Sequence, residues 1–141
     1  MDKIKEKLPT LMDAVKAMFA GLHEAEASEK CSINMDTFGK EENGICFGCA
    51  ATFTLVNSGL ASIDKALDLA TNYTCRIEED DDLINFEHMI DDFRLGLVRP
   101  LLNFYGHSYI GAVEPWLLKN SNWKDWEGSI VKWVEELEKS V

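Results

Sequence analysis

One stretch decides which fold class the sequence predicts: CFGCAATFTLVNSGLASIDKALDLA, residues 46–70. Its apolar side chains recur at steps of three and four residues, which is the period of an α-helix that buries one face. Two features oppose one continuous helix, because TFTLV at 52–56 has β-branched, alternating character and NSG at 57–59 is typical of a turn. We expect helix throughout, either continuous or divided into two helices near Gly59. The apolar positions are Cys46, Cys49, Phe53, Val56, Leu60, Ile63, Leu67 and Ala70.

The rest of the chain repeats the helical period, so the sequence predicts an all-α fold. The domain is expected to span residues 1–141 as an irregular bundle of five to seven helices. The predicted helices cover about 8–26, 46–70, 83–99 (ended or kinked by Pro100) and 124–139, with one or two short helices between 100 and 120. A loop is expected at about 27–45, where polar residues and glycines gather, and an acidic connection at about 76–83.

The composition excludes several classes of function. The chain has 141 residues, of which 46% are hydrophobic and 28% charged, as in a globular protein with its own core. Its 25 acidic and 14 basic residues give a net charge of −11, which opposes binding to nucleic acid or to an anionic membrane surface. The N-terminal sequence lacks the apolar run of a signal peptide, so we expect a cytoplasmic protein with reduced cysteines.

The acid-rich region from Glu78 to Asp92 carries the leading functional hypothesis. No compensating base interrupts its acidic residues. On a helical wheel Glu87, His88, Asp91 and Asp92 point away from the apolar stripe of Phe86, Ile90, Phe93 and Leu97. Dense negative charge speeds association with a basic protein surface. The sequence therefore predicts a non-enzymatic protein without a cofactor, which binds a partner as immunity proteins, antitoxins or regulators do. The predicted partner-binding residues are Glu78, Glu79, Asp80, Asp81, Asp82, Glu87, Asp91 and Asp92.

The cysteine pair Cys46 and Cys49 supports a second hypothesis. A C-x-x-C pair at the start of a helix is a pattern of thiol redox proteins, because the helix dipole stabilises a thiolate. It is also half of a zinc site, with Cys31 or Cys75 as a further ligand. The simplest interpretation, however, is two buried thiols, since both lie on the apolar stripe of residues 46–70.

A third hypothesis is a helical protein that binds a small molecule or cofactor. Aromatic and polar side chains concentrate between residues 104 and 116, where they could line a pocket. The predicted lining residues are Phe104, Tyr105, His107, Tyr109 and Trp116.

Overall fold

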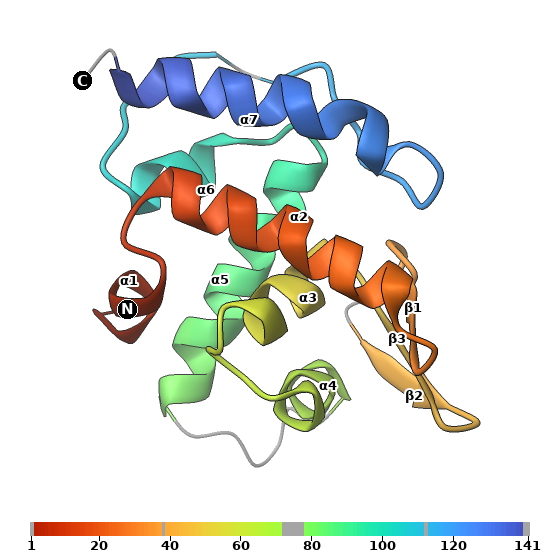
Figure 1. The fold of residues 1–141 in the computed structure, drawn as a ribbon. Coiled ribbons are helices and arrows are strands. Elements are labelled where there is room, and N and C mark those ends of the chain that lie inside the picture. Colours follow the sequence, from red (N-terminus) through yellow and green to blue (C-terminus); the bar gives the residue numbers. More distant parts are fainter. Residues whose placement is uncertain (1, 38, 72–77, 112, 140–141) are drawn as a thin grey trace.

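The computed structural model describes residues 2–37, 39–71, 78–111 and 113–139. It is 60% helical, and its described part combines seven helices with one sheet of three strands (Figure 1). The prediction of an all-α fold is therefore wrong. The helices are α1 (Asp2–Lys7), α2 (Leu11–Ala27), α3 (Ala50–Asn57), α4 (Ile63–Thr71), α5 (Glu78–Arg94), α6 (Arg99–Phe104) and α7 (Trp123–Lys139). The strands are β1 (Cys31–Ile33), β2 (Lys40–Glu42) and β3 (Ile45–Gly48).

The sheet replaces the predicted loop at 27–45 and the first turn of the predicted helix at 46–70. Its strand order is β1-β3-β2, with β1 parallel and β2 antiparallel to β3. Asn43 and Gly44 connect β2 to β3, and both have positive φ angles, 55° and 79°. Such a two-residue Asn-Gly turn matches the twist of a β-hairpin. The Asn43-Gly44 turn therefore favours the hairpin. The sequence analysis missed it because the apolar residues that follow have a helical period.

The helical period of residues 46–70 holds only from Ala50 onward. Cys49 is the N-cap of α3, and α3 ends before Ser58 and Gly59 (φ 76°), so of the two alternatives the structure has the divided helix. α3 packs against both α2 and α5. Because it is covered on two sides, even Thr54 is fully buried, and its hydroxyl donates to the carbonyl of Ala50 at 2.6 Å.

The predicted helix at 8–26 is confirmed as α2, which begins at Leu11 because Thr10 caps it. The Thr10 hydroxyl accepts the backbone N–H of Asp13 at 3.2 Å, and the Asp13 carboxylate accepts the backbone N–H of Thr10 at 3.1 Å. α2 crosses the middle of the molecule, with α7 along one side, α3 along the other and the sheet at its C-terminal end (Figure 1).

α5 differs at both ends from its predicted span of 83–99. It already includes the acids from Glu78 onward, so the described part of the predicted acidic connection is helical. It ends at Arg94 because Gly96 follows with a φ of 83°. A Cβ at Gly96 would also lie 2.5 Å from the carbonyl oxygen of Glu114. Gly96 therefore allows both the end of the helix and the close approach of the segment that leads to α7. Pro100 lies in the first turn of α6.

Candidate functional site

The fold divides the acids of α5 between its interior and its surface. Asp80 and Glu87 are only 5% and 4% exposed, so neither lies on an exposed face as the prediction of partner-binding residues requires. Asp81 is exposed, whereas Asp82, Asp91 and Asp92 are half-buried. The cause is that α5 packs against α3 as well as α6, which buries a second face that the helical wheel did not reveal. The side chains of Glu78 and Glu79 lie outside the described residues.

Asp80 has a structural ion pair with Lys65 of α4. The Lys65 Nζ lies 2.9 Å from one carboxylate oxygen of Asp80 and 3.0 Å from the other. Since the Asp80 side chain is 6% exposed and that of Lys65 is 39% exposed, the pair lies at the edge of the core. It ties the first turn of α5 to α4, and it leaves Asp80 shielded from a partner.

Glu87 is a buried carboxyl group one helical turn before Asp91. Burial, and then the negative charge of Asp91, raise the pKa of Glu87 to about 8. Glu87 is therefore mostly protonated at neutral pH, which suits its position inside the fold. Burial and Asp91 also raise the pKa of Asp92, which His88 partly offsets.

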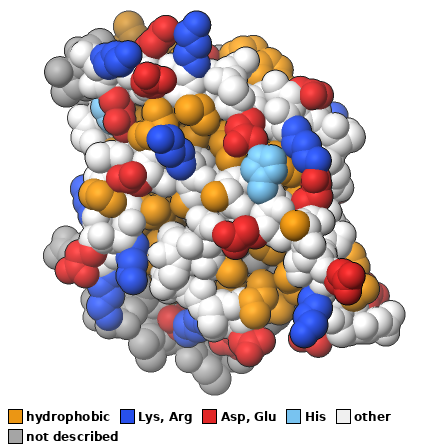
Figure 2. Space-filling view, in the orientation of Figure 1, with side chains coloured by type: hydrophobic (Ala, Val, Ile, Leu, Met, Phe, Trp, Pro, Cys, Tyr) orange, Lys and Arg blue, Asp and Glu red, His pale blue; other side chains and the backbone are white. Residues whose placement is uncertain are grey.

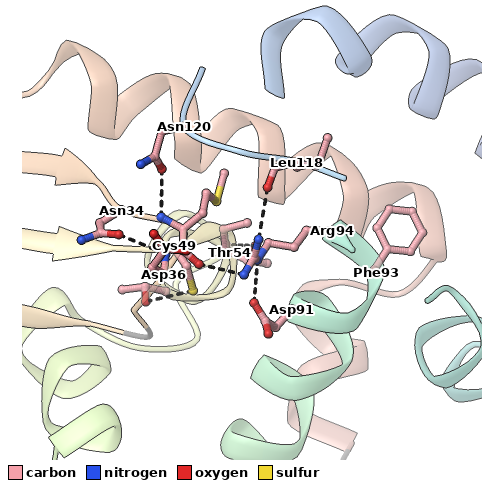
Figure 3. A network of polar contacts seen from close by, with 12 residues as sticks. Asn34, Asp36, Cys49, Thr54, Asp91, Phe93, Arg94, Leu118 and Asn120 are labelled. Atoms are coloured by element: carbon pink, nitrogen blue, oxygen red, sulfur yellow. Dashed lines mark hydrogen bonds and ion pairs between the residues drawn. The ribbon is translucent and has the colours of Figure 1, made fainter. Parts of the chain in front are cut away.

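Arg94, at the end of α5, joins three parts of the chain (Figure 3). Its Nε donates to the Asp91 carboxylate at 2.6 Å, its Nη1 to the carbonyl of Leu118 at 3.1 Å and its Nη2 to the carbonyl of Met35 at 2.7 Å. Asn120 accepts the Met35 N–H at 2.9 Å and so closes the network. The Arg94 side chain is 11% exposed. The Arg94 guanidinium therefore has a structural role in these contacts. No sequence pattern identified Arg94 as important.

Two grooves flank Arg94. The smaller, of about 210 Å³, is lined by Met35, Asp36, Thr37, Cys49, Asp91 and Arg94. The larger, of about 510 Å³, lies toward Leu117 and Asn120. The smaller groove brings a thiol and two carboxylates together, but no group of three or more His, Cys, Asp or Glu side chains among the described residues is arranged to hold a metal ion.

The predicted cysteine pair is not a spatial pair of exposed thiols. Cys49 is 1% exposed, its sulfur lies 3.8 Å from the Thr52 hydroxyl, and burial raises its pKa. Cys46 is 6% exposed, and burial, followed by contact with the Cys31 thiol, raises its pKa to about 12. Raised pKa values oppose thiolate chemistry at a C-x-x-C site. Cys75 lies outside the described residues.

The aromatic residues predicted to line a pocket pack largely against each other and the core. Trp116 is 4% exposed, and its indole N–H donates to the carbonyl of Phe93 at 2.7 Å. The Tyr105 hydroxyl donates to the carbonyl of Leu8 at 2.9 Å, and burial raises its pKa. The rings of Phe104 and Tyr109 contact Phe86 and Trp133 at centroid distances of 5.7 and 5.6 Å. His107 is half-buried. The two grooves beside Arg94 are lined by other residues.

The outer side of α5 carries a polar stripe. Asp81, Asn85, His88 and Asp92 recur at steps of four, three and four residues, so they share one face of the helix, and they are exposed or half-buried. We call these four residues the α5 stripe. After the stripe the chain leaves the helix. The carbonyl of Asp92 accepts the N–H of Leu97 at 2.9 Å, and this hydrogen bond closes the turn that follows α5.

Four exposed apolar side chains lie in the segments that follow α5, and we name this set, Leu97, Ile110, Val113 and Leu117, the apolar patch. These side chains are 41%, 95%, 61% and 42% exposed. The Glu114 N–H donates to the carbonyl of Gly96 at 2.8 Å, which holds the segment of Val113 beside that of Leu97. Leu97 was predicted to lie on the buried stripe of its helix, but it follows the end of α5. The sequence offered one sign that Ile110 and Val113 are exposed, which is that they fit no helical period.

On the face shown in Figure 2, Lys and Arg side chains alternate with Asp and Glu around small apolar areas. Among the described residues, no helix is long and apolar enough to cross a membrane. Comparison of the chain with protein-family models, with curated proteins and with solved structures finds no match.

Proposed function

We propose that the protein binds a basic protein partner through the α5 stripe and the adjoining apolar patch. The observation that carries the proposal is the patch itself. Ile110 and Val113 expose 95% and 61% of their surface in the segment between α6 and α7, which the hydrogen bond from Glu114 to Gly96 joins to the C-terminal end of α5, although the core has buried most other large apolar side chains. Exposed apolar groups that adjoin charged ones are typical of interfaces, in which an apolar centre is surrounded by a polar rim.

Each part of this surface has its own physical role. The apolar side chains supply the burial that holds a complex together, and a few of them usually carry most of the binding energy. Asp81 and Asp92 of the stripe, and the neighbouring Asp82, carry negative charge. Together with the net charge of −11, this local charge speeds the approach of a positively charged surface. Asp80 and Glu87 have no part in this proposal because they are buried.

The apolar half of the proposal is tested with the double substitution Ile110→Ser and Val113→Ser. The immobilised protein is used to capture proteins from a lysate of the cells that make it, and the main captured protein is then purified and its affinity measured. Because both side chains are exposed, the variant should fold normally, while its affinity should fall at least tenfold. The control is Ile45→Ser, which removes an apolar side chain that is 38% exposed on β3. Equal loss in the control and in the double variant would contradict the proposed site.

The acidic half is tested with Asp81→Asn, Asp82→Asn and Asp92→Asn combined. The matched control neutralises three exposed acids elsewhere, in Glu6→Gln, Glu29→Gln and Glu135→Gln, so both proteins lose the same charge. The α5 variant should bind the purified partner with a lower association rate and a weaker dependence on salt than the control variant. An association rate that depends only on the total charge would refute a specific role for α5.

A further inference from the structure

Cys31 and Cys46, which are 15 positions apart in the sequence, are direct neighbours in the sheet. They are partners in the parallel ladder of β1 and β3, so their side chains point to the same face. Strands in a sheet lie ~4.8 Å apart, within the ~4.4–6.8 Å range of Cα separations that a disulfide spans. The ladder is fixed at both ends, because Cys46 N–H donates to the Lys30 carbonyl and Asn34 N–H to the Gly48 carbonyl, each at 2.8 Å.

The two thiols differ in their access to solvent. Cys31 is half-buried at the edge strand β1, whereas Cys46 is 6% exposed on the central strand. On its other side Cys46 pairs with Glu41 of β2, whose negative charge opposes a thiolate at Cys46. Reagents in solution therefore reach Cys31 first, and Cys46 lies beside it as the second thiol.

Cys49 has different neighbours. It caps α3, its thiol lies near the Thr52 hydroxyl, and it lines the small groove beside Arg94. We propose that Cys31 and Cys46, and not the C-x-x-C pair, form a dithiol that exchanges with low-molecular-weight disulfides of the glutathione type and closes to an intramolecular disulfide. This inference does not rest on the proposed partner binding.

The exchange proceeds in two balanced steps. The Cys31 thiol loses its proton to solvent, and the thiolate attacks one sulfur of oxidised glutathione. The glutathione S–S bond breaks, a mixed disulfide forms, and one glutathione leaves as a thiolate that takes up a proton. The Cys46 thiol then loses its proton to solvent, and its sulfur attacks the Cys31 sulfur. The new Cys31–Cys46 bond forms, and the second glutathione thiolate leaves and is protonated. In total the protein loses two hydrogens, and one oxidised glutathione becomes two reduced molecules. Because Cys46 is buried, the second step should be the slower one.

The test uses the full-length protein in buffers of oxidised and reduced glutathione, with acid quenching and mass spectrometry of the intact chain and of its peptides. The expected product has lost 2 Da and contains a peptide cross-link between Cys31 and Cys46, after a transient glutathione adduct on Cys31. A cross-link between Cys46 and Cys49, or a stable adduct on Cys31 without loss of 2 Da, would overturn the inference.

Single substitutions separate the roles of the cysteines. Cys46→Ala should retain the glutathione adduct on Cys31, because the second thiol is missing, and Cys31→Ala should form neither product. Cys49→Ala and Cys75→Ser should still lose 2 Da as the wild-type chain does. Failure of Cys49→Ala to close, while it keeps a wild-type circular dichroism spectrum, would assign the second thiol to Cys49 and overturn the inference. The result for the wild-type peptides decides the question even if a buried alanine disturbs folding.

Discussion

The buried carboxyl group of Glu87 makes a prediction about stability and pH. The substitution Glu87→Gln replaces an ionisable side chain by a neutral one of nearly the same size. Burial and the neighbouring charge of Asp91 raise the pKa of Glu87 from 4.5 to about 8 in the folded protein. A group with a raised native pKa contributes stability that is fully present below its unfolded pKa and is lost as the pH rises through its native pKa. Glu87 therefore destabilises the native protein increasingly between pH 4.5 and about 8.

The size of the effect follows from these two pKa values. Each pH unit between them costs ~1.4 kcal/mol of unfolding free energy. The interval from 4.5 to about 8 is about 3.5 units, so the full loss is about 5 kcal/mol. At pH 7 about 2.5 units have been crossed, which corresponds to about 3 kcal/mol. The glutamine variant avoids this loss because it cannot ionise.

Urea unfolding at pH 4.5, 7 and 9, followed by tryptophan fluorescence, measures the difference between Glu87→Gln and the wild-type protein. The variant should gain about 3 kcal/mol relative to the wild type between pH 4.5 and 7, and about 5 kcal/mol between pH 4.5 and 9. A constant difference at all three pH values would refute the reasoning, since a packing effect of the amide does not depend on pH. The control is Glu6→Gln, the same substitution at an exposed acid, measured at the same three pH values.

Three further substitutions test the local arguments, each by urea unfolding at pH 7. Gly96→Ala should destabilise the protein by about 2–4 kcal/mol, because its φ of 83° and the nearby Glu114 carbonyl both oppose a Cβ; wild-type stability would show that the turn relaxes freely. Arg94→Met should lower the free energy of unfolding by about 3 kcal/mol, because the Asp91 carboxylate and two backbone carbonyls lose their donor. An unchanged stability would contradict the structural role of Arg94 in joining these segments. Thr10→Ala should cost about 1 kcal/mol through loss of the helix cap, and no change would show that the cap is dispensable.

The helices were predictable because their stability follows the 3.6-residue period that the sequence displays directly. α2 begins three residues after its predicted start and ends one residue after its predicted end, and the connection between α3 and α4 contains Gly59. The sheet was missed because its strands are only three or four residues long, too short to establish an alternating pattern. The Asn43-Gly44 turn was the available hairpin signal, but the apolar steps that begin at Cys46 favoured helix.

The candidate surface was predictable only in part. A single sequence does not show whether a neighbouring helix covers a face other than the apolar stripe. The wheel of α5 identified the stripe around Phe86 and Ile90 correctly, and both are buried. It placed Glu87 on the outside because nothing in the sequence shows that α5 packs against both α3 and α6. Ile110 lies in an irregular segment, where its exposure depends on backbone contacts that no periodicity encodes.

The strand order β1-β3-β2 has a consequence for the kinetics of folding. β2 and β3 are joined by a two-residue turn, so this hairpin forms from local contacts on a timescale of ~1–10 μs. β1 follows directly after α2 in the sequence and also packs against it, so it arrives with that helix. The parallel pairing of β1 and β3 then has to bring two preformed units together, the β2–β3 hairpin and α2 with β1. This step is slower because it costs the entropy of closing the loop between them. The same boundary should open first under native conditions, so the amide of Cys46, which donates across it, should exchange with solvent before the amides within α2.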